Sequence, residues 1–272
     1  MKTMKTMKTM KIRFFALAAL ILSLLATSGG CGIAEITETQ RTTILIAAAA
    51  SLENVLKGEI IPAFQNEYPG ITVEATYASS GNLQTQIEEG LEADIFFSAA
   101  TKQMNALSDK GLVDKDSVVN LLENALVLIV PIDSLLEISS FSDIIKADTI
   151  SLGDPASVPA GQYAQAVLED LGVYGEALAK ASLASNVTEA LNAVAEASAD
   201  AGIVYATDAA SMPDKVKVAA DAPAGAEKVI YPVGIVSASQ NRNSAQLFVD
   251  FLQDKTASDA FAARGFKPIA GQ

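Results

Sequence analysis

The sequence contains no histidine and no tryptophan, and its only cysteine is Cys31. Without histidine the chain can form neither a Ser-His-Asp triad nor a histidine-based acid–base pair, and one cysteine cannot complete a His/Cys zinc site. A single cysteine also excludes a disulfide within the chain. Any chemistry must therefore come from hydroxyls, carboxylates, amines and backbone groups.

The first thirty residues have the pattern of a signal peptide. Basic residues between Lys2 and Arg13 precede the apolar run 14–26, which is too short to span a bilayer. Small residues then lead to Cys31, as in lipoprotein signals, where the cysteine becomes the lipidated first residue. Ser28 departs from the aliphatic residue preferred at that position, so ordinary secretion is the alternative. We expect a signal peptide over 1–30 and a tether over 31–42.

Basic residues are few in the remainder of the chain. Residues 1–30 hold five of the 19 Lys and Arg residues and none of the 32 Asp and Glu residues, so the chain after residue 30 carries a net charge of −18. A surface of this sign disfavours nucleic acid and anionic lipid as the main partners. An anion site would have to be built from local donors, against the overall field.

From residue 43 onward, strand-like and helix-like segments alternate, which predicts an α/β fold with mainly parallel sheets flanked by helices. The pairs are 43–48 with 52–68, 71–77 with 82–89, 94–98 with 102–110, 149–152 with 162–171, 183–185 with 187–199, and 201–205 with a helix from 207. No linker rich in Pro, Gly or Ser divides this part. The long apolar strands 125–130 and 230–236 therefore indicate two lobes joined by crossing strands, with the hinge near Val127 and Val233. We expect lobe 1 at 43–124 plus 233–272, and lobe 2 at 125–232.

Five turns share one design, because each follows a predicted strand or precedes a helix and none contains Lys or Arg. They are 48–56, 77–83, 153–163, 184–191 and 202–208. In parallel α/β sheets, ligands bind beyond the carboxyl ends of the strands. The turns offer the hydroxyls of Ser51, Ser80 and Tyr205. They also offer the early-helix amides of Ala160 and Val187.

Such a set of donors suits a fully ionised anion. Helix N-termini carry about half a positive charge each and bind anions through free amides. A protonated oxyanion would bring a proton that finds no acceptor. Each residue also has a purely structural interpretation: Ser51 and Ser80 as helix N-caps, Tyr205 as a packing residue, and Asp154, Asp208 and Glu189 as turn and cap residues. The convergence of five turns is what favours a site.

Six segments resemble one known family in the same order and spacing. They are AAASL at 48–52, YASSG at 77–81, ADIF at 93–96, GDPASVPAG at 153–161, GIVYATDA at 202–209 and YPV at 231–233. The family is that of the extracytoplasmic molybdate-binding proteins of ATP-driven (ABC) molybdate importers, the ModA type. The resemblance runs from about Thr43 to Pro268.

The resemblance implies a two-lobed type II periplasmic-binding-protein fold that closes on molybdate or tungstate in the cleft between the lobes. By matching position it implies that Ser51 and Ser80 donate from side chain and backbone, Ala160 and Val187 from backbone amides, and Tyr205 from its hydroxyl. Molybdenum would be held only as the oxyanion, with no direct protein ligand and no cofactor. It further implies a monomer that is not an enzyme, lies outside the cytoplasm on a lipid anchor at Cys31, and serves an ABC permease.

Three alternatives remain at this point. The same fold could bind sulfate or another tetrahedral oxyanion. An exported hydrolase could use Ser51 or Ser80 as nucleophile, but it needs an activating base, and the chain has no His, no Ser-x-x-Lys and no Gly-x-Ser-x-Gly. A structural surface lipoprotein would leave the five turns unexplained. Some related binders add carboxylate ligands to the metal, and no matching carboxylate is placed here.

Overall fold

The computed structural model describes residues 41–269, which belong to one compact unit, Thr39–Gln272. The predicted signal peptide, Cys31 and nearly all of the predicted tether lie outside the described residues. Within the described range, no helix combines the length and the apolar character needed to cross a membrane.

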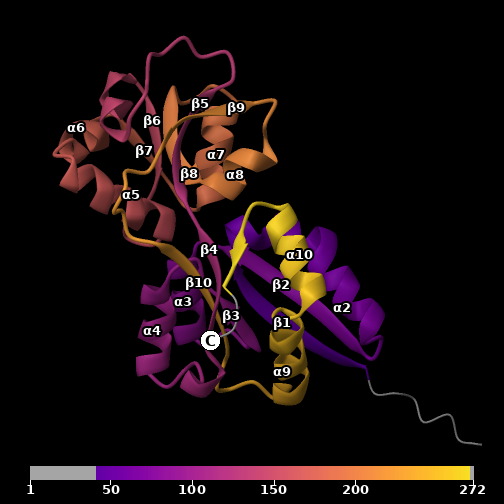
Figure 1. The fold of residues 1–272 in the computed structure, drawn as a ribbon. Coiled ribbons are helices and arrows are strands. Elements are labelled where there is room, and N and C mark those ends of the chain that lie inside the picture. The colour runs from indigo at the N-terminus through magenta and orange to yellow at the C-terminus, as the bar shows by residue number, and fades with distance from the viewer. Residues whose placement is uncertain (1–40, 270–272) are drawn as a thin grey trace, which may run out of the picture. The chain divides into compact units, whose positions relative to one another are not determined.

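Two mixed sheets with flanking helices make up the described residues, and each sheet is the centre of one lobe (Figure 1). The first sheet has the strand order β11-β4-β10-β3-β1-β2. Its strands are β1 (Thr42–Ala49), β2 (Ile71–Ala78), β3 (Ile95–Phe97), β4 (Val119–Asn124), β10 (Val229–Ile235) and β11 (Lys267–Pro268).

The second sheet has the order β7-β6-β8-β5-β9. Its strands are β5 (Leu126–Pro131), β6 (Ile150–Gly153), β7 (Ala181–Ala184), β8 (Ala201–Tyr205) and β9 (Val216–Asp221). Neither sheet is mainly parallel, contrary to the sequence-based expectation. The βα units give the parallel blocks β2-β1-β3 and β7-β6-β8, whereas β4, β10, β11, β5 and β9 pair antiparallel.

Helical segments cover both sheets. Those of the first lobe are η1 (Ala50–Leu52), α1 (Glu53–Val55), η2 (Leu56–Ile60), α2 (Ile61–Glu67), α3 (Ser80–Glu88), α4 (Thr101–Asp109), η3 (Lys115–Ser117), α9 (Arg242–Phe251) and α10 (Lys255–Ala263). Those of the second are η4 (Phe141–Lys146), α5 (Pro159–Asp170), α6 (Tyr174–Ala179), α7 (Val187–Ala195) and α8 (Ala206–Ser211).

The helix predicted over 52–68 is one continuous helical segment with three geometries. It begins as a 3-10 turn, widens into the π-helical η2 and ends as α2. Pro62 follows the π segment closely, and its ring and missing amide disfavour regular α-helical bonding with the preceding turn. The segment packs through Phe64, whose ring lies edge-on to Phe248 and Phe251 at centroid distances of 4.9 and 5.4 Å.

The chain changes sheets at two places. The first is Ala125, between β4 and β5, and the second is the segment 222–228, between β9 and β10. Val127 and Val233, near which the sequence predicts a hinge, lie inside hydrogen-bonded strands next to these crossings. Strand β10 pairs with β4 from Val229 onward, so the predicted lobe boundary at 232/233 falls within a strand of the first sheet.

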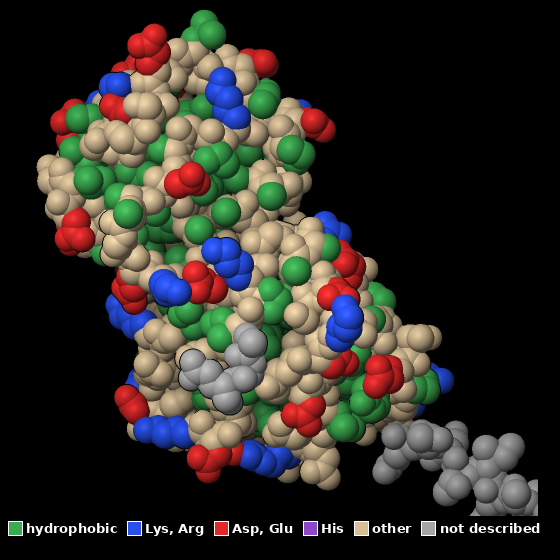
Figure 2. All heavy atoms as spheres, in the orientation of Figure 1, with side chains coloured by type: hydrophobic (Ala, Val, Ile, Leu, Met, Phe, Trp, Pro, Cys, Tyr) green, Lys and Arg blue, Asp and Glu red, His purple; other side chains and the backbone are tan. Residues whose placement is uncertain are grey.

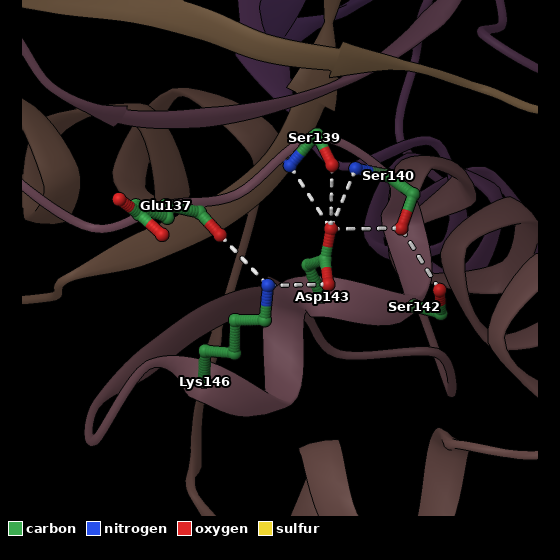
Figure 3. A network of polar contacts seen from close by, with 6 residues as sticks. All are labelled: Glu137, Ser139, Ser140, Ser142, Asp143 and Lys146. Carbon is green, nitrogen blue, oxygen red and sulfur yellow. Dashed lines mark hydrogen bonds and ion pairs between the residues drawn. The ribbon is translucent and has the colours of Figure 1, made fainter.

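A cluster of polar residues lies at the end of the long connection between β5 and β6. Asp143, in η4, accepts hydrogen bonds from the backbone and side-chain groups of Ser139 and Ser140 and pairs with Lys146 (Figure 3). These donors, Lys146 first among them, hold the pKa of the Asp143 carboxyl well below its usual range. Lys146 also donates to the Glu137 carbonyl oxygen, so one carboxylate orders the end of the connection.

Acidic and basic side chains are interspersed on the face drawn in Figure 2, and no basic patch gathers there.

Candidate functional site

A small cavity lies between the two lobes, at the ends of the parallel strands. The first lobe lines it with Ala49, Ala50, Ser51, Ala78, Ser79, Ser80 and Ala99, and the second with Val158, Pro159, Ala160, Val187 and Tyr205. All five residues singled out from the sequence are in this lining. None of the described lining residues is charged. The space open to the centre of a water-sized sphere is about 10 Å³, which leaves no room for an organic substrate in this arrangement of the lobes.

Three helices begin at the cavity and bring free amides to it. Ser80 is the first residue of α3, Val187 is the first of α7, and Ala160 follows Pro159 at the start of α5. The first amides of a helix have no acceptor within the helix. Each helix therefore directs unpaired N–H groups and the positive end of its dipole toward the same lining.

The caps of two of these helices are the residues before the candidate donors. The Ser79 side chain accepts from the Asn82 amide at 3.3 Å, and the Asn186 side chain accepts from the Glu189 amide at 2.9 Å. Glu189 in turn accepts from the Ser185 amide, close to the capping-box pattern that the sequence suggested. The interpretation of Ser80 as an N-cap is therefore wrong, because Ser79 occupies that position.

Ser51 is not an N-cap either. The 3-10 turn begins at Ala50, its N-cap is Ala49, and no side chain caps it. Ser51 is already inside the turn, and its Oγ lies 2.9 Å from the Oη of Tyr231. The hydroxyl is thus held by a side chain on β10, far away in the sequence.

Ser80 and Tyr205, the other two hydroxyl residues singled out from the sequence, can each donate a proton in a hydrogen bond. The Oγ of Ser80 accepts a hydrogen bond from the Ala99 amide at 2.9 Å, which leaves its own proton uncommitted. The Oη of Tyr205 is buried and has no hydrogen-bond partner among residues 41–269. Burial raises the pKa of Tyr205 well above its ordinary value, so the phenol keeps its proton near neutral pH and can donate it in a hydrogen bond.

The lobes touch beside the cavity. The Gly81 amide donates to the Ser157 carbonyl oxygen at 2.9 Å, and the Gln103 Nε2 donates to the Gln162 Oε1 at 3.1 Å. A Cβ at Gly81 would lie 2.4 Å from that same Ser157 oxygen, so glycine is the residue that permits this approach. The contact joins the start of α3 to the turn before α5.

A larger cavity of about 410 Å³ adjoins the site, with Ser51 in the lining of both. Asp208 lies in its wall and is buried, and burial raises the pKa of its carboxyl to about 7. Its Oδ2 accepts from the Tyr205 amide at 3.2 Å, so the sequence-based interpretation as a cap residue holds. Its proximity to the site is a structural finding.

The arrangement is suited to binding and not to bond cleavage. Among residues 41–269, no base is hydrogen-bonded to the hydroxyl of Ser51 or Ser80, because the partner of Ser51 is a phenol with a raised pKa and that of Ser80 is a backbone amide. Across the described range, no group of three or more His, Cys, Asp or Glu side chains is placed to hold a metal ion. The cavity is lined by groups that can donate protons in hydrogen bonds.

Comparison with known proteins places the chain among transport proteins. The profile described as bacterial extracellular solute-binding protein matches residues 44–267. The putative ABC transporter substrate-binding lipoprotein YvgL of Bacillus subtilis (strain 168) is 35% identical over 92% of this chain and 96% of its own length. The molybdate-binding protein ModA of Haemophilus influenzae is 36% identical over 82% of this chain and 89% of its own.

Among solved structures, the periplasmic molybdate-binding protein of Azotobacter vinelandii superposes with a TM-score of 0.72 over 82% of this chain and 98% of that one. Its sequence identity of 22% supports the fold alone. The two-lobed periplasmic-binding-protein fold expected from the resemblance is confirmed.

Proposed function

We propose that this chain, which belongs to the family of bacterial extracellular solute-binding proteins, binds molybdate or tungstate and delivers it to an ABC permease. Members of this family carry solutes for transporters and are not enzymes. The sequence relationship to molybdate-binding proteins supports this choice of ligand.

The observation that carries the proposal is the lining of the cavity between the lobes. Ser51, Ser80 and Tyr205 contribute hydroxyls, and Ala160 and Val187 contribute helix-start amides, with no charged side chain among them. Each hydrogen bond to an ionised group stabilises a complex by roughly 1.5–3 kcal/mol. Five or more such donors can replace the hydration of a tetrahedral dianion without a cation.

The proposed chemistry also limits the ligand. A site with donors alone disfavours hydrogen phosphate, because its proton would find no acceptor. Sulfate shares the tetrahedral shape and full ionisation, so binding of sulfate by the same fold is the alternative. The small volume of the cavity disfavours phosphorylated organic molecules.

Titration calorimetry with molybdate, tungstate, sulfate and phosphate tests the proposal. We expect molybdate and tungstate to bind far more tightly than sulfate, and phosphate to bind least. Sulfate binding as tight as that of molybdate would transfer the assignment to the alternative.

A double variant, Ser51→Ala with Ser80→Ala, tests the site. Saturating molybdate should raise the melting temperature of the wild-type protein, because a ligand that binds only the folded state stabilises it. The double variant should lose most of this shift. Wild-type affinity in the double variant would show that the anion binds elsewhere.

Anchoring at Cys31 is a further part of the proposal, and the lipoprotein name of the Bacillus relative supports it. A lipid on Cys31 would hold a monomeric binding protein beside its permease, outside the cytoplasm. Labelling with a radioactive fatty acid should mark the wild-type protein and not Cys31→Ser. Equal labelling of both would exclude this anchor.

A further inference from the structure

The hydroxyl of Ser51 is the end of a chain of side-chain hydrogen bonds. Its Oγ lies 2.9 Å from the Oη of Tyr231, and that Oη lies 3.3 Å from the Nδ2 of Asn124. Asn124 also donates to the Oγ1 of Thr207 at 2.9 Å. Asn124, Tyr231 and Thr207 are buried, and Tyr231 is fully shielded from solvent.

The backbone fixes the direction of this chain. The Ala125 amide, which can only donate, lies 2.9 Å from Asn124 Oδ1. The side-chain amide of Asn124 must therefore present its oxygen there and its NH₂ group to Thr207 and Tyr231. A reversed amide would place two donors against each other at Ala125.

The orientation of the Asn124 amide then sets the direction of the hydrogen bonds of Tyr231 and Ser51. The Tyr231 oxygen accepts from Asn124, so the single phenolic proton is available for its other neighbour, Ser51. The Tyr231 pKa is raised well above its ordinary value, chiefly by burial, so this proton is present at neutral pH. The Ser51 oxygen therefore accepts a hydrogen bond from the Tyr231 hydroxyl, and the proton of Ser51 stays free.

We propose that Tyr231 and Asn124 are positioning residues that make Ser51 a proton donor toward the cavity. Ser80 reaches the same state by a different route, because its oxygen accepts from the Ala99 backbone amide. The hydroxyls of Ser51 and Ser80 can thus both donate to a ligand in the cavity. The backbone orients that of Ser80, and side chains orient that of Ser51. Only the second can be changed by substitution.

This inference rests on the proposed function, because it concerns the same anion site. It adds a cause of selectivity. If these hydrogen bonds ran in the opposite direction, Ser51 would donate to Tyr231 and present a lone pair to the ligand. That lone pair could accept the proton of hydrogen phosphate and would repel the oxygen of molybdate.

The first test is a double-mutant cycle with molybdate as the probe. Tyr231→Phe keeps the ring, which packs edge-on against Tyr205 and Phe266, and removes only the hydroxyl. We expect it to weaken molybdate binding about 3- to 10-fold, a part of the value of a charged hydrogen bond. The effect should vanish in a Ser51→Ala background and persist in full in Ser80→Ala.

The second test reverses the direction of the hydrogen bonds between Asn124, Tyr231 and Ser51. In Asn124→Asp the new carboxylate still accepts from the Ala125 amide but can no longer donate to Tyr231. The Tyr231 hydroxyl then donates a hydrogen bond to this carboxylate, and the Ser51 hydroxyl donates one to the Tyr231 oxygen. We expect the molybdate-to-phosphate affinity ratio to fall about 10-fold or more. Adding Tyr231→Phe frees the Ser51 proton again, so the double variant should bind molybdate more tightly than Asn124→Asp alone.

Tyr231→Phe should weaken molybdate binding in the wild-type background and strengthen it in the Asn124→Asp background. This change of sign separates a positioning role from an effect of charge or of structural damage. If Asn124→Asp acts only through its negative charge, Tyr231→Phe will weaken binding in both backgrounds, and the inference is overturned. An equal effect of Tyr231→Phe with and without Ser51 would overturn it as well. Tyr68→Phe, on a tyrosine stacked on Phe64 outside the lining, is the matched control.

Thermal unfolding establishes that each variant is folded. Should Tyr231→Phe fail to fold, Asn124→Asp with and without Ser51→Ala makes the same comparison, because its effect on the molybdate-to-phosphate ratio must disappear without the serine hydroxyl. If the wild-type protein did not bind molybdate, the proposed function itself would be refuted. If the wild-type protein bound molybdate but the effects of Tyr231→Phe and Ser51→Ala were additive, only this inference would be refuted.

Discussion

At the scale of single residues, the candidate site contains a polar group that no described residue satisfies. The Oη of Tyr205 is buried without a partner among the described residues, and a buried unsatisfied hydroxyl costs about 1–3 kcal/mol. An anion in the cavity would accept its proton. The cost is then present in the free protein and relieved in the complex, which gives the two states opposite responses to removal of the hydroxyl.

Tyr205→Phe should therefore stabilise the free protein and weaken the complex. We expect the free energy of unfolding without ligand to rise by about 1 kcal/mol and molybdate affinity to fall about 10- to 100-fold. Chemical denaturation and calorimetry measure the two effects. Tyr77→Phe is the control, because the Tyr77 Oη is also buried and unpartnered within residues 41–269, but Tyr77 is not in the lining. It should stabilise the protein and leave affinity unchanged, and a loss of affinity there would contradict the assignment.

Asp208 should make stability depend on pH. Burial raises the pKa of its carboxyl from 3.8 to about 7 in the folded protein. The folded state then holds more protons than the unfolded state between these values, so this group lowers the free energy of unfolding as pH rises from about 4 to about 7. Above pH 7 its contribution is level.

Asp208→Asn keeps an oxygen to accept from the Tyr205 amide and removes the charge. The difference in unfolding free energy between variant and wild type should grow from pH 4 to pH 7 in favour of the variant. Denaturant titrations across this range measure it. A difference that is constant with pH would show that the carboxyl does not change its ionisation on folding.

The roles of Tyr231 and Asn124 could not be read from the sequence. The small-residue turns marked Ser51 and Ser80 as candidate donors, because turn and helix-start patterns are local. Which groups a hydroxyl contacts depends on strands that are distant in sequence, and Tyr231 is 180 residues from Ser51. The YPV segment was recognised, but its hydrogen bonds required the fold.

At the scale of elements, the sequence predicts the βα units and the long apolar strands β5 and β10, but it does not predict β4, β9 and β11 or the antiparallel pairing. A strand followed by an amphipathic helix has a periodicity that marks both, which is why β1, β2 and β3 and the helices after them were anticipated. Strand β4 (VNLLEN) alternates poorly, and β9 (VKVAAD) lies outside the βα units, paired with β5 alone. These strands are defined by pairing with β10 and β5, a tertiary property, so the mixed character of both sheets was missed.

Gly81, at the start of α3, makes closure of the lobes sensitive to one methyl group. Its added Cβ would meet the Ser157 oxygen at 2.4 Å and the Ser157 Cα at 2.7 Å, so either the turn before α5 or the lobes themselves must move apart from α3. We expect Gly81→Ala to weaken molybdate binding about 10-fold or more, the effect of a closure penalty near ~1.4 kcal/mol. Its unfolding free energy without ligand should not fall, since alanine favours a helix over glycine.

Gly58→Ala is the matched control for this prediction. Gly58 also lies in a helical segment, and the nearest atom to its added Cβ is a side-chain nitrogen of Arg264 at 4.0 Å. Calorimetry should find wild-type affinity in Gly58→Ala. If Gly81→Ala also kept wild-type affinity, the contact between Gly81 and Ser157 would not be needed in the liganded state.

At the scale of the whole molecule, two strand crossings join lobes that each supply part of one cavity. Neither lobe alone surrounds a ligand, since the serines come from the first and Ala160, Val187 and Tyr205 from the second. A ligand bound by both would stabilise the closed arrangement by its differential affinity for that state. The network at Asn124 and Tyr231 lies at these crossings, so the same residues that direct Ser51 also contact α8 of the second lobe through Thr207.

The acidic character of the molecule should govern how fast an anion arrives. The chain after residue 30 carries a net charge of −18, and the cavity lining has no cation among its described residues to offset it. Long-range repulsion should slow association, and salt should relieve it, because the Debye length shortens to about 8 Å at 0.15 M.

We expect the association rate constant for molybdate to rise about two- to fivefold as KCl is raised from low to physiological strength. Stopped-flow tyrosine fluorescence can follow this, since the chain has no tryptophan. The dissociation rate constant should change little, because the hydrogen bonds to the anion are buried. An association rate that falls with salt would mean that the helix N-termini make the cavity entrance positive in spite of the surrounding charge.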